Sequence, residues 1–199
     1  MKLSLVLCVV LVAFSVCSNG AEQTNYEYYT SGGIKSGLRA DSVDFTLNGK
    51  KITLFSGSLH YFRLPKDYWK DRLLKYRAAG LNTIQTYSPW NLHEPIPGQF
   101  DFETGFLNLV DFLKACKEAD MFVVYRPGPY ICAEWELGGY PAWFLRDPNM
   151  RFRSNYKPYL DAVGKYYSKV LSLIDDYQFQ KGGPVIAFQF ENEFGGIHS

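Results

Sequence analysis

Hydrophobic residues recur along this chain with two alternating patterns, which predict strands and helices in turn. Short runs such as 122–124 and 185–188 are apolar at every position, as expected for strands of a parallel sheet that helices cover. Between these runs, hydrophobic residues return every three or four positions, which is the spacing of an amphipathic helix. This alternation predicts an α/β fold with a parallel sheet.

The expected order of elements begins with a hairpin. Asn48-Gly49 is a strong tight-turn dipeptide between the β-rich stretches 45–47 and 52–55, and the second arm is expected to continue towards His60. The later elements then alternate: helix 64–82, strand 83–87, helix 106–121, strand 121–130, helix 158–177 and strand 184–193.

Two architectures fit this order, an open doubly wound sheet and a (β/α) barrel. No glycine-rich nucleotide turn follows the first strand, which disfavours the dinucleotide-binding version of the open sheet. Long loops follow two strands, at 89–98 and 127–146, and barrel enzymes build their sites from such loops. We therefore expect an incomplete (β/α)8 TIM barrel containing about the first four strand–helix units.

Composition narrows the class of protein. The 199 residues are 47% hydrophobic and 17% aromatic, which is enough for one sizeable core but too little for two ordinary domains. The chain has 21 basic and 20 acidic residues, so its net charge predicts no nucleic-acid partner and no acidic membrane surface.

The first twenty residues have the pattern of a secretory signal peptide. Lys2 precedes an apolar run over 3–16, and small residues follow at 18–20. The run is too short for a stable membrane span. We expect residues 21–199 to form the mature chain, in the secretory pathway and then in the lysosome or outside the cell. Such compartments permit a disulfide between Cys116 and Cys132, although their spacing leaves the pairing open.

Polar and aromatic side chains gather after each predicted strand, where a barrel would bring them together. They supply carboxylates, amides, hydroxyls and ring faces, a combination that suits a sugar with its hydroxyls and its apolar C–H face. The residues are His60, Tyr61, Arg63, Tyr87, Trp90, Asn91, His93, Glu94, Arg126, Tyr130, Glu134, Trp135, Glu136, Glu191, Asn192 and Glu193. The sequence contains no nucleophile-elbow motif and no metal-ligand spacing, so no cofactor and no metal is predicted.

Several of these residues also have structural interpretations. Trp90 and Trp135 can be core residues or sugar platforms, and Glu134, between apolar neighbours, should be either paired or functional. Glu94 and Glu136 can be surface charges. The basic residues are interpreted as structural, with the arginines balancing carboxylates beneath the site: His60, His93, Arg63 and Arg126.

The triplet Glu191-Asn192-Glu193 is the most distinctive of these groups. On a regular strand Glu191 and Glu193 would share one face, but where a strand ends this alternation breaks down and neighbours can enter one cavity. A general acid needs a carboxyl that low-polarity surroundings keep protonated. Glu193 follows an apolar strand and precedes Phe194, so we expect such surroundings for it.

Four stretches carry these features together: "SLHYFRLPKDYWKDRLLKYRAAGLN", "TYSPWNLHEPIPGQFDF", "RPGPYICAEWELGGYPAWF" and "GGPVIAFQFENEFG". With them the chain resembles glycoside hydrolase family 35, the acid-type β-galactosidases, from about Thr46 to Gly195. The resemblance implies a (β/α)8 barrel followed by β-rich domains. It also implies retaining hydrolysis of terminal β-D-galactose from glycans and glycolipids.

The resemblance assigns roles to single residues. It implies that Glu193 is the proton donor and that Asn192 binds the sugar beside the reacting carbon. It implies that Tyr87, Ala133 and Glu134 hold the galactose, and that Glu191 supports the site from below.

A retaining mechanism needs a second carboxylate, the nucleophile, about 5–5.5 Å from the first. In the family it lies on a later strand, which we expect to be missing from this chain. Two alternatives to a β-galactosidase therefore stay open: an inactive, truncated galactoside-binding fragment, and a related β-glycosidase that acts on another sugar.

Overall fold

The centre of the computed structural model, which describes residues 23–41 and 43–196, is a parallel sheet of four strands in the order β4-β5-β6-β7. The strands are β4 (Ser56–Ser58), β5 (Thr83–Tyr87), β6 (Phe122–Gly128) and β7 (Val185–Phe190). The predicted signal peptide, residues 1–20, lies outside the described residues. Neighbouring strands follow one another in the sequence, as in a barrel.

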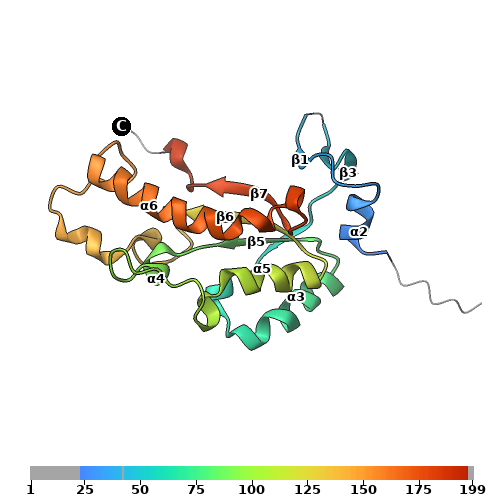
Figure 1. Ribbon diagram of the computed structural model, residues 1–199, viewed down its shortest axis with the longest axis horizontal. Helices are drawn as coiled ribbons and strands as arrows, with labels where there is room; N and C mark the ends of the chain where they lie inside the picture. Colours follow the sequence, from blue (N-terminus) through green and yellow to red (C-terminus); the bar gives the residue numbers. More distant parts are fainter. Residues whose placement is uncertain (1–22, 42, 197–199) are drawn as a thin grey trace, which may run out of the picture.

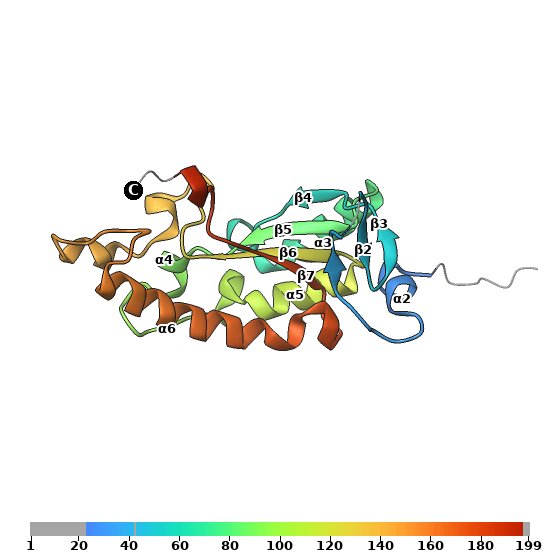
Figure 2. The same cartoon turned by 90° about the horizontal axis from the view of Figure 1, so that it is seen from above.

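Three longer helices connect these strands: α3 (Trp69–Ala78), α5 (Leu109–Glu118) and α6 (Lys157–Ile174). They cover one face of the sheet (Figures 1 and 2). The repeated strand–helix order confirms the predicted α/β fold, and four parallel strands make half of an eight-stranded barrel. None of the helices among the described residues is long and apolar enough to cross a membrane.

Shorter helices lie in the connections. One of them is an α-helix, α4 (Trp90–His93). The others are 3-10 helices: η1 (Tyr61–Arg63), η2 (Lys66–Tyr68), η3 (Gly105–Leu107), η4 (Glu136–Gly139), η5 (Ala142–Arg146), η6 (Asp175–Tyr177), η7 (Phe179–Lys181) and η8 (Phe194–Gly196).

A small antiparallel sheet precedes the half-barrel. It consists of β1 (Leu38–Arg39), β2 (Phe45–Leu47) and β3 (Lys50–Ile52), and the predicted Asn48-Gly49 turn joins β2 to β3. The expected continuation of the second arm towards His60 is wrong. Ser56–Ser58 instead leaves the hairpin and pairs in parallel with β5, because Gly57 fits against Tyr76 and Leu81, where a Cβ would come within 2.3 Å and 2.7 Å of their side chains.

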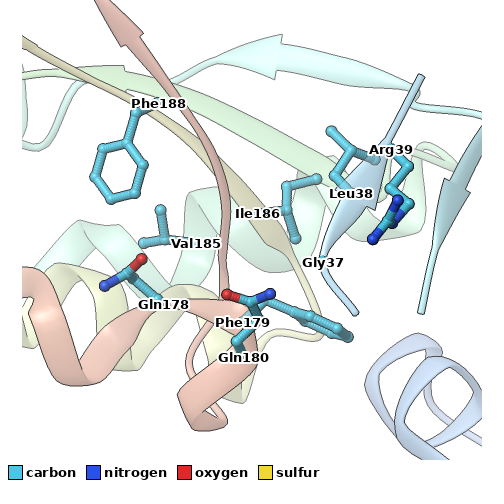
Figure 3. Close-up of a pocket in the computed structure, with 9 residues that line it drawn as sticks. All are labelled: Gly37, Leu38, Arg39, Gln178, Phe179, Gln180, Val185, Ile186 and Phe188. Atoms are coloured by element: carbon cyan, nitrogen blue, oxygen red, sulfur yellow. The ribbon is translucent and has the colours of Figure 1, made fainter. Parts of the chain in front are cut away.

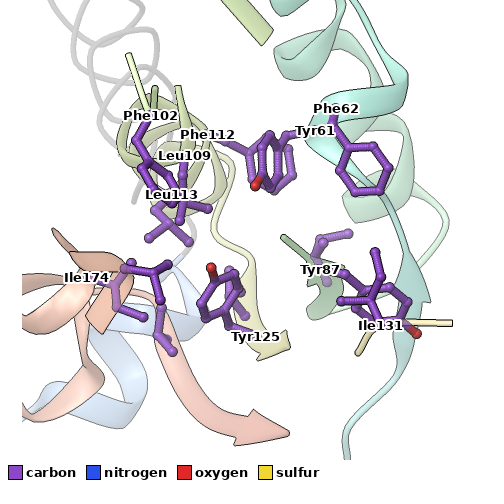
Figure 4. Packing of buried hydrophobic residues seen from close by; sticks show 14 of the residues in the cluster. Tyr61, Phe62, Tyr87, Phe102, Leu109, Phe112, Leu113, Tyr125, Ile131 and Ile174 are labelled. Carbon is purple, nitrogen blue, oxygen red and sulfur yellow. The ribbon is translucent and has the colours of Figure 1, made fainter. Parts of the chain in front are cut away.

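The core lies between the sheet and its helices. Figure 4 shows residues of α5, among them Phe112 and Leu113, beside Tyr61 and Tyr125, and all four are fully buried. The other face of the sheet carries polar groups, since Gln85 Nε2 donates to Gln189 Oε1 at 3.0 Å. Burial of one face against helices thus leaves the opposite face to line the interior of the half-barrel.

The amino ends of the strands are tied to the N-terminal helix α2 (Asn25–Thr30) by Asp120, which follows α5. The Asp120 carboxylate accepts hydrogen bonds from the backbone N–H groups of Asn25, at 2.9 Å, and Tyr26, at 3.0 Å. It also pairs with Arg77 at 3.0 Å. A carboxylate at a helix N-terminus satisfies otherwise unpaired N–H groups, so this contact fixes α2 to the sheet.

Candidate active site

A pocket of about 440 Å³ opens at the carboxyl end of the parallel sheet. Residues from the ends of all four strands line it: Ser58, His60, Arg63, Tyr87, Arg126, Cys132, Ala133, Glu134, Asn192 and Glu193. Barrel enzymes place their chemistry at this end of the sheet.

The five residues selected from the sequence all line this pocket. Tyr87 ends β5, Ala133 and Glu134 lie in the loop after β6, and Asn192 and Glu193 follow β7. Asn192 and Glu193 share the cavity although they are neighbours in sequence, as expected where a strand ends. Glu191 and Glu193 have left-handed φ angles of 63° and 49°, which is how the alternation of the strand is broken.

The Tyr87 ring contacts the side chains of Arg126 and His60. The Arg126 guanidinium carbon lies 3.8 Å from the centre of the ring, and the His60 ring centre lies 4.4 Å away on a tilted plane. A cation over a tyrosine face is attracted to it, so these contacts fix the ring at the pocket wall.

Both pocket arginines bind backbone carbonyls. Arg63 Nη2 donates to Ala133 O, and Arg126 Nη1 donates to Ile131 O at 2.8 Å. In the segment that these bonds hold, Cys132, Ala133 and Glu134 have φ angles of 59°, 59° and 47°. Left-handed backbone costs non-glycine residues roughly 1–2 kcal/mol each, and the two arginines offset part of that cost.

In the described part of the chain neither arginine forms a close ion pair, so the prediction that they balance carboxylates holds only for Arg126, which interacts with the charge of Glu193 at longer range. Arg126 donates its other amino group to Gln189 Oε1 at 2.9 Å. Burial lowers the pKa of Arg126, while the charges of Tyr87, Cys132 and Glu193 act in the opposite direction. Arg126 therefore serves the site as a buried, positively charged neighbour of Glu193.

The two histidines differ in their surroundings. His93 is fully buried and bonds through Nε2 to the Tyr61 hydroxyl and through Nδ1 to Asp101 O, both at 2.6 Å, as predicted for a structural residue. His60 lines the pocket. Burial, with Arg63 and Arg126 nearby, lowers the pKa of His60 to about 4, so it is neutral near pH 7.

Trp90 and Glu94 belong to the core beneath the site. Trp90 is fully buried and stacks on Tyr166 with ring centres 4.5 Å apart, which excludes it as a sugar platform. Its Nε1 donates to Glu94 Oε2 at 2.5 Å, and Gly98 N donates to Glu94 Oε1 at 2.6 Å. Glu94 is 5% exposed, so it is a satisfied buried carboxylate rather than a surface charge.

Both pocket carboxylates, Glu134 and Glu193, are exposed. The sequence predicts apolar surroundings for Glu193, but the described residues do not enclose its side chain. Its neighbour Phe194 is 53% exposed. The reason is that β7 ends at Phe190, so Glu193, three residues further along the chain, is no longer flanked by the apolar strand.

Glu191 is not among the residues that line the pocket, and it pairs with Arg153, whose Nε lies 3.1 Å from Glu191 Oε2. Burial raises the pKa of Glu191, and the positive charge of Arg153 opposes this shift. The sequence reading missed Arg153, because no local pattern links it to a residue 38 positions later in the chain.

A second pocket, of about 330 Å³, lies beside the amino-terminal half of β7 (Figure 3). Its lining joins β1 to β7 and to the segment before β7, and it contains one charged side chain, Arg39. No carboxylate lines it, so the acid chemistry predicted from the sequence has no place there. Cys116 and Cys132 are free thiols, and no group of three potential metal ligands lies together in residues 23–41 and 43–196.

The sequence profile described as glycosyl hydrolases family 35 matches residues 44–199, which include every residue lining the larger pocket. The chain belongs to this family. The human protein named beta-galactosidase-1-like protein 2 is 50% identical over 162 residues, 81% of this chain and 25% of its own length. The cat protein named beta-galactosidase is 50% identical over 151 residues, 76% of this chain and 22% of its own length. The family member described here thus spans about a quarter of these relatives.

Solved structures bear out the fold. An exo-beta-1,4-mannosidase from Opitutaceae bacterium strain TAV5 superposes with a TM-score of 0.60 at 18% identity, over 82% of this chain and 28% of that one. A beta-galactosidase from the psychrophilic Marinomonas ef1 gives a TM-score of 0.51 at 17% identity, over 72% of this chain and 22% of that one. At such identities the likeness concerns the backbone, and it confirms the partial barrel.

Proposed function

We propose that this family 35 chain carries the acid half of the active site of a retaining β-galactosidase. One observation carries the proposal: Tyr87, Ala133, Glu134, Asn192 and Glu193, selected from the sequence, line one pocket at the catalytic end of the half-barrel. The names of the relatives support galactose as the sugar.

In the proposed reaction, Glu193 protonates the glycosidic oxygen while a second carboxylate attacks the anomeric carbon. The bond to the leaving oxygen breaks, and a galactosyl ester forms. Glu193, now ionised, then takes a proton from a water molecule as its oxygen attacks the anomeric carbon; the ester bond to the second carboxylate breaks, and galactose leaves with retained configuration. Tyr87, Ala133, Glu134 and Asn192 would hold the sugar. We expect the nucleophile on a later strand of the barrel.

Sodium azide can replace that nucleophile in a test of the chain itself. Azide would attack the anomeric carbon of 4-methylumbelliferyl β-D-galactoside, giving α-galactosyl azide and the protonated phenol. Glu193→Gln should lower this azide-dependent rate by about 10²-fold or more, the usual contribution of a general acid. With a 2,4-dinitrophenyl leaving group, which needs no proton, the loss should be much smaller. Glu136→Gln, an exposed carboxylate outside this pocket, is the matched control.

The alternatives give different results. Galactose binding by calorimetry without azide-dependent turnover would favour a galactoside-binding fragment. A preference for the matching glucoside or mannoside would favour another β-glycosidase. Equal rates for Glu193→Gln and the unmodified chain with both leaving groups would contradict the role proposed for Glu193.

We also infer delivery to the secretory pathway, with the lysosome or the extracellular space as destination, from the pattern of residues 1–20. Expression in a eukaryotic cell line, followed by N-terminal sequencing, tests it. A mature chain that starts near Ala21 is the expected result, and a chain that retains Lys2 would contradict the inference.

A further inference from the structure

The turn after β7 holds a conformation that its own residues do not favour. Glu191 and Glu193 both have left-handed φ angles, 63° and 49°, and neither is glycine. One backbone bond, from Glu191 N to Gly128 O at 2.9 Å, still ties the turn to β6. Disfavoured backbone of this kind persists only where surrounding contacts determine it, and it is common at functional sites.

Arg153 supplies such contacts at two successive residues of the turn. Its Nε lies 3.1 Å from Glu191 Oε2, and its Nη2 donates to the backbone oxygen of Asn192. The side chains of Arg153 and Glu191 are 16% and 15% exposed, so the pair is shielded from water. Arg153 therefore contacts both the residue that begins the turn and the residue proposed to bind the sugar.

Aromatic rings fix the guanidinium itself. Its carbon lies 4.4 Å from the ring centre of Tyr130, just after β6, and 5.5 Å from that of Phe194, just after the turn. A planar guanidinium can stack on rings and donate through several N–H groups at once, whereas a lysine ammonium cannot. The contacts thus join the loop before α6, the end of β6 and the turn after β7.

We propose that Arg153 is a positioning residue that fixes the turn Glu191–Glu193 and thereby directs Asn192 and Glu193 into the pocket. Arg153 is not among the residues that line the pocket, so it acts through the turn and not on the sugar. The inference rests on the proposed function for the roles of Asn192 and Glu193. The contacts that hold the turn do not depend on it.

The test compares Arg153→Met and Arg153→Lys with Arg151→Met, which removes an exposed arginine two residues away. Hydrogen exchange, followed by mass spectrometry on peptides that cover 189–196, reports the turn without any substrate. We expect both Arg153 variants to exchange at least about tenfold faster there, with unchanged exchange in β5. Arg151→Met should match the unmodified chain.

Azide-dependent turnover then separates positioning from simple stabilisation. A displaced acid can cost about 10²-fold in rate, so Arg153→Met should lose about that factor with the 4-methylumbelliferyl galactoside. It should lose much less with the 2,4-dinitrophenyl galactoside, which needs no proton. A purely structural role would lower both rates equally and would overturn the inference, as would unchanged exchange at the turn. If the unmodified chain neither binds galactose nor turns over either galactoside, the proposed function fails. Hydrogen exchange at the turn then decides the role of Arg153.

Discussion

The Tyr61 hydroxyl lies 2.6 Å from His93 Nε2, in a buried chain of hydrogen bonds that continues through Ser88 to Tyr125. Burial is the largest influence on His93 and lowers its pKa from 6.5 to about 4. The folded protein therefore keeps this ring neutral at a pH where the unfolded chain would already bind a proton.

This difference predicts a loss of stability in acid. Between about pH 6.5 and pH 4 the unfolded state binds more protons at His93, so the free energy of unfolding falls as pH falls. A depression from 6.5 to about 4 corresponds to about 3 kcal/mol at the acidic end. Urea denaturation at pH 7 and pH 4.5 measures it.

His93→Gln removes the titrating ring from the same position. The variant should be less stable than the unmodified chain at pH 7. The difference between their free energies of unfolding should be about 2 kcal/mol smaller at pH 4.5. His60→Gln is a second test of the same effect, because burial also lowers the pKa of His60 to about 4 and the variant should respond to pH in the same direction. A gap that is the same at both pH values would contradict this account of His93.

Arg63 offers a prediction about binding. Its hydrogen bond to Ala133 O holds the turn that carries two proposed galactose-binding residues, but it does not reach the turn with Glu193. Arg63→Met should therefore weaken galactose binding about tenfold, or about 1.4 kcal/mol, while the dependence of the rate on the leaving group stays unchanged. Calorimetry with galactose measures the first effect.

The control for this variant is Arg72→Met, which removes an exposed arginine of α3 that pairs with Asp71. It should bind galactose like the unmodified chain. Equal affinity of Arg63→Met and Arg72→Met would show that the Arg63 contact does not shape the pocket.

Two glycines should respond to alanine in opposite directions. A Cβ on Gly183 would lie 1.9 Å from the backbone oxygen of Tyr177, so Gly183→Ala should destabilise the protein by about 3 kcal/mol or more. Gly164 lies inside α6 with nothing within 4 Å of its Cβ position. Gly164→Ala should therefore raise the free energy of unfolding by about 0.5–1 kcal/mol. Urea denaturation of both variants checks the pair, and a stable Gly183→Ala would show that the backbone there can move.

Much of the fold could be predicted because hydrophobic spacing carries it. Strand β5 has the predicted bounds, 83–87, α5 lies within the predicted helix, and α6 begins one residue before the predicted helix and ends within it. The first parallel strand differs, since the sequence predicts it as part of the hairpin. Ser56-Gly57-Ser58 contains no large apolar residue, and its sheet is decided by pairing with β5, which only the tertiary structure supplies.

The site divides in the same way. Its chemical groups could be selected because each follows a strand, and the structure brings Tyr87, Ala133, Glu134, Asn192 and Glu193 together. The residues that position these groups could not be predicted from the sequence. Arg63 reaches a carbonyl 70 residues away and Arg153 one 39 residues away, and left-handed backbone at non-glycine positions leaves no mark in the sequence.

Asp120 joins α2 to the amino ends of the strands, whereas the candidate chemical groups lie at the opposite rim. The five residues of β5 keep the two rims roughly 16 Å apart. Evolution can therefore remodel how the N-terminal segment is anchored without disturbing sugar recognition, and can adapt recognition to a new glycan without loosening the anchor.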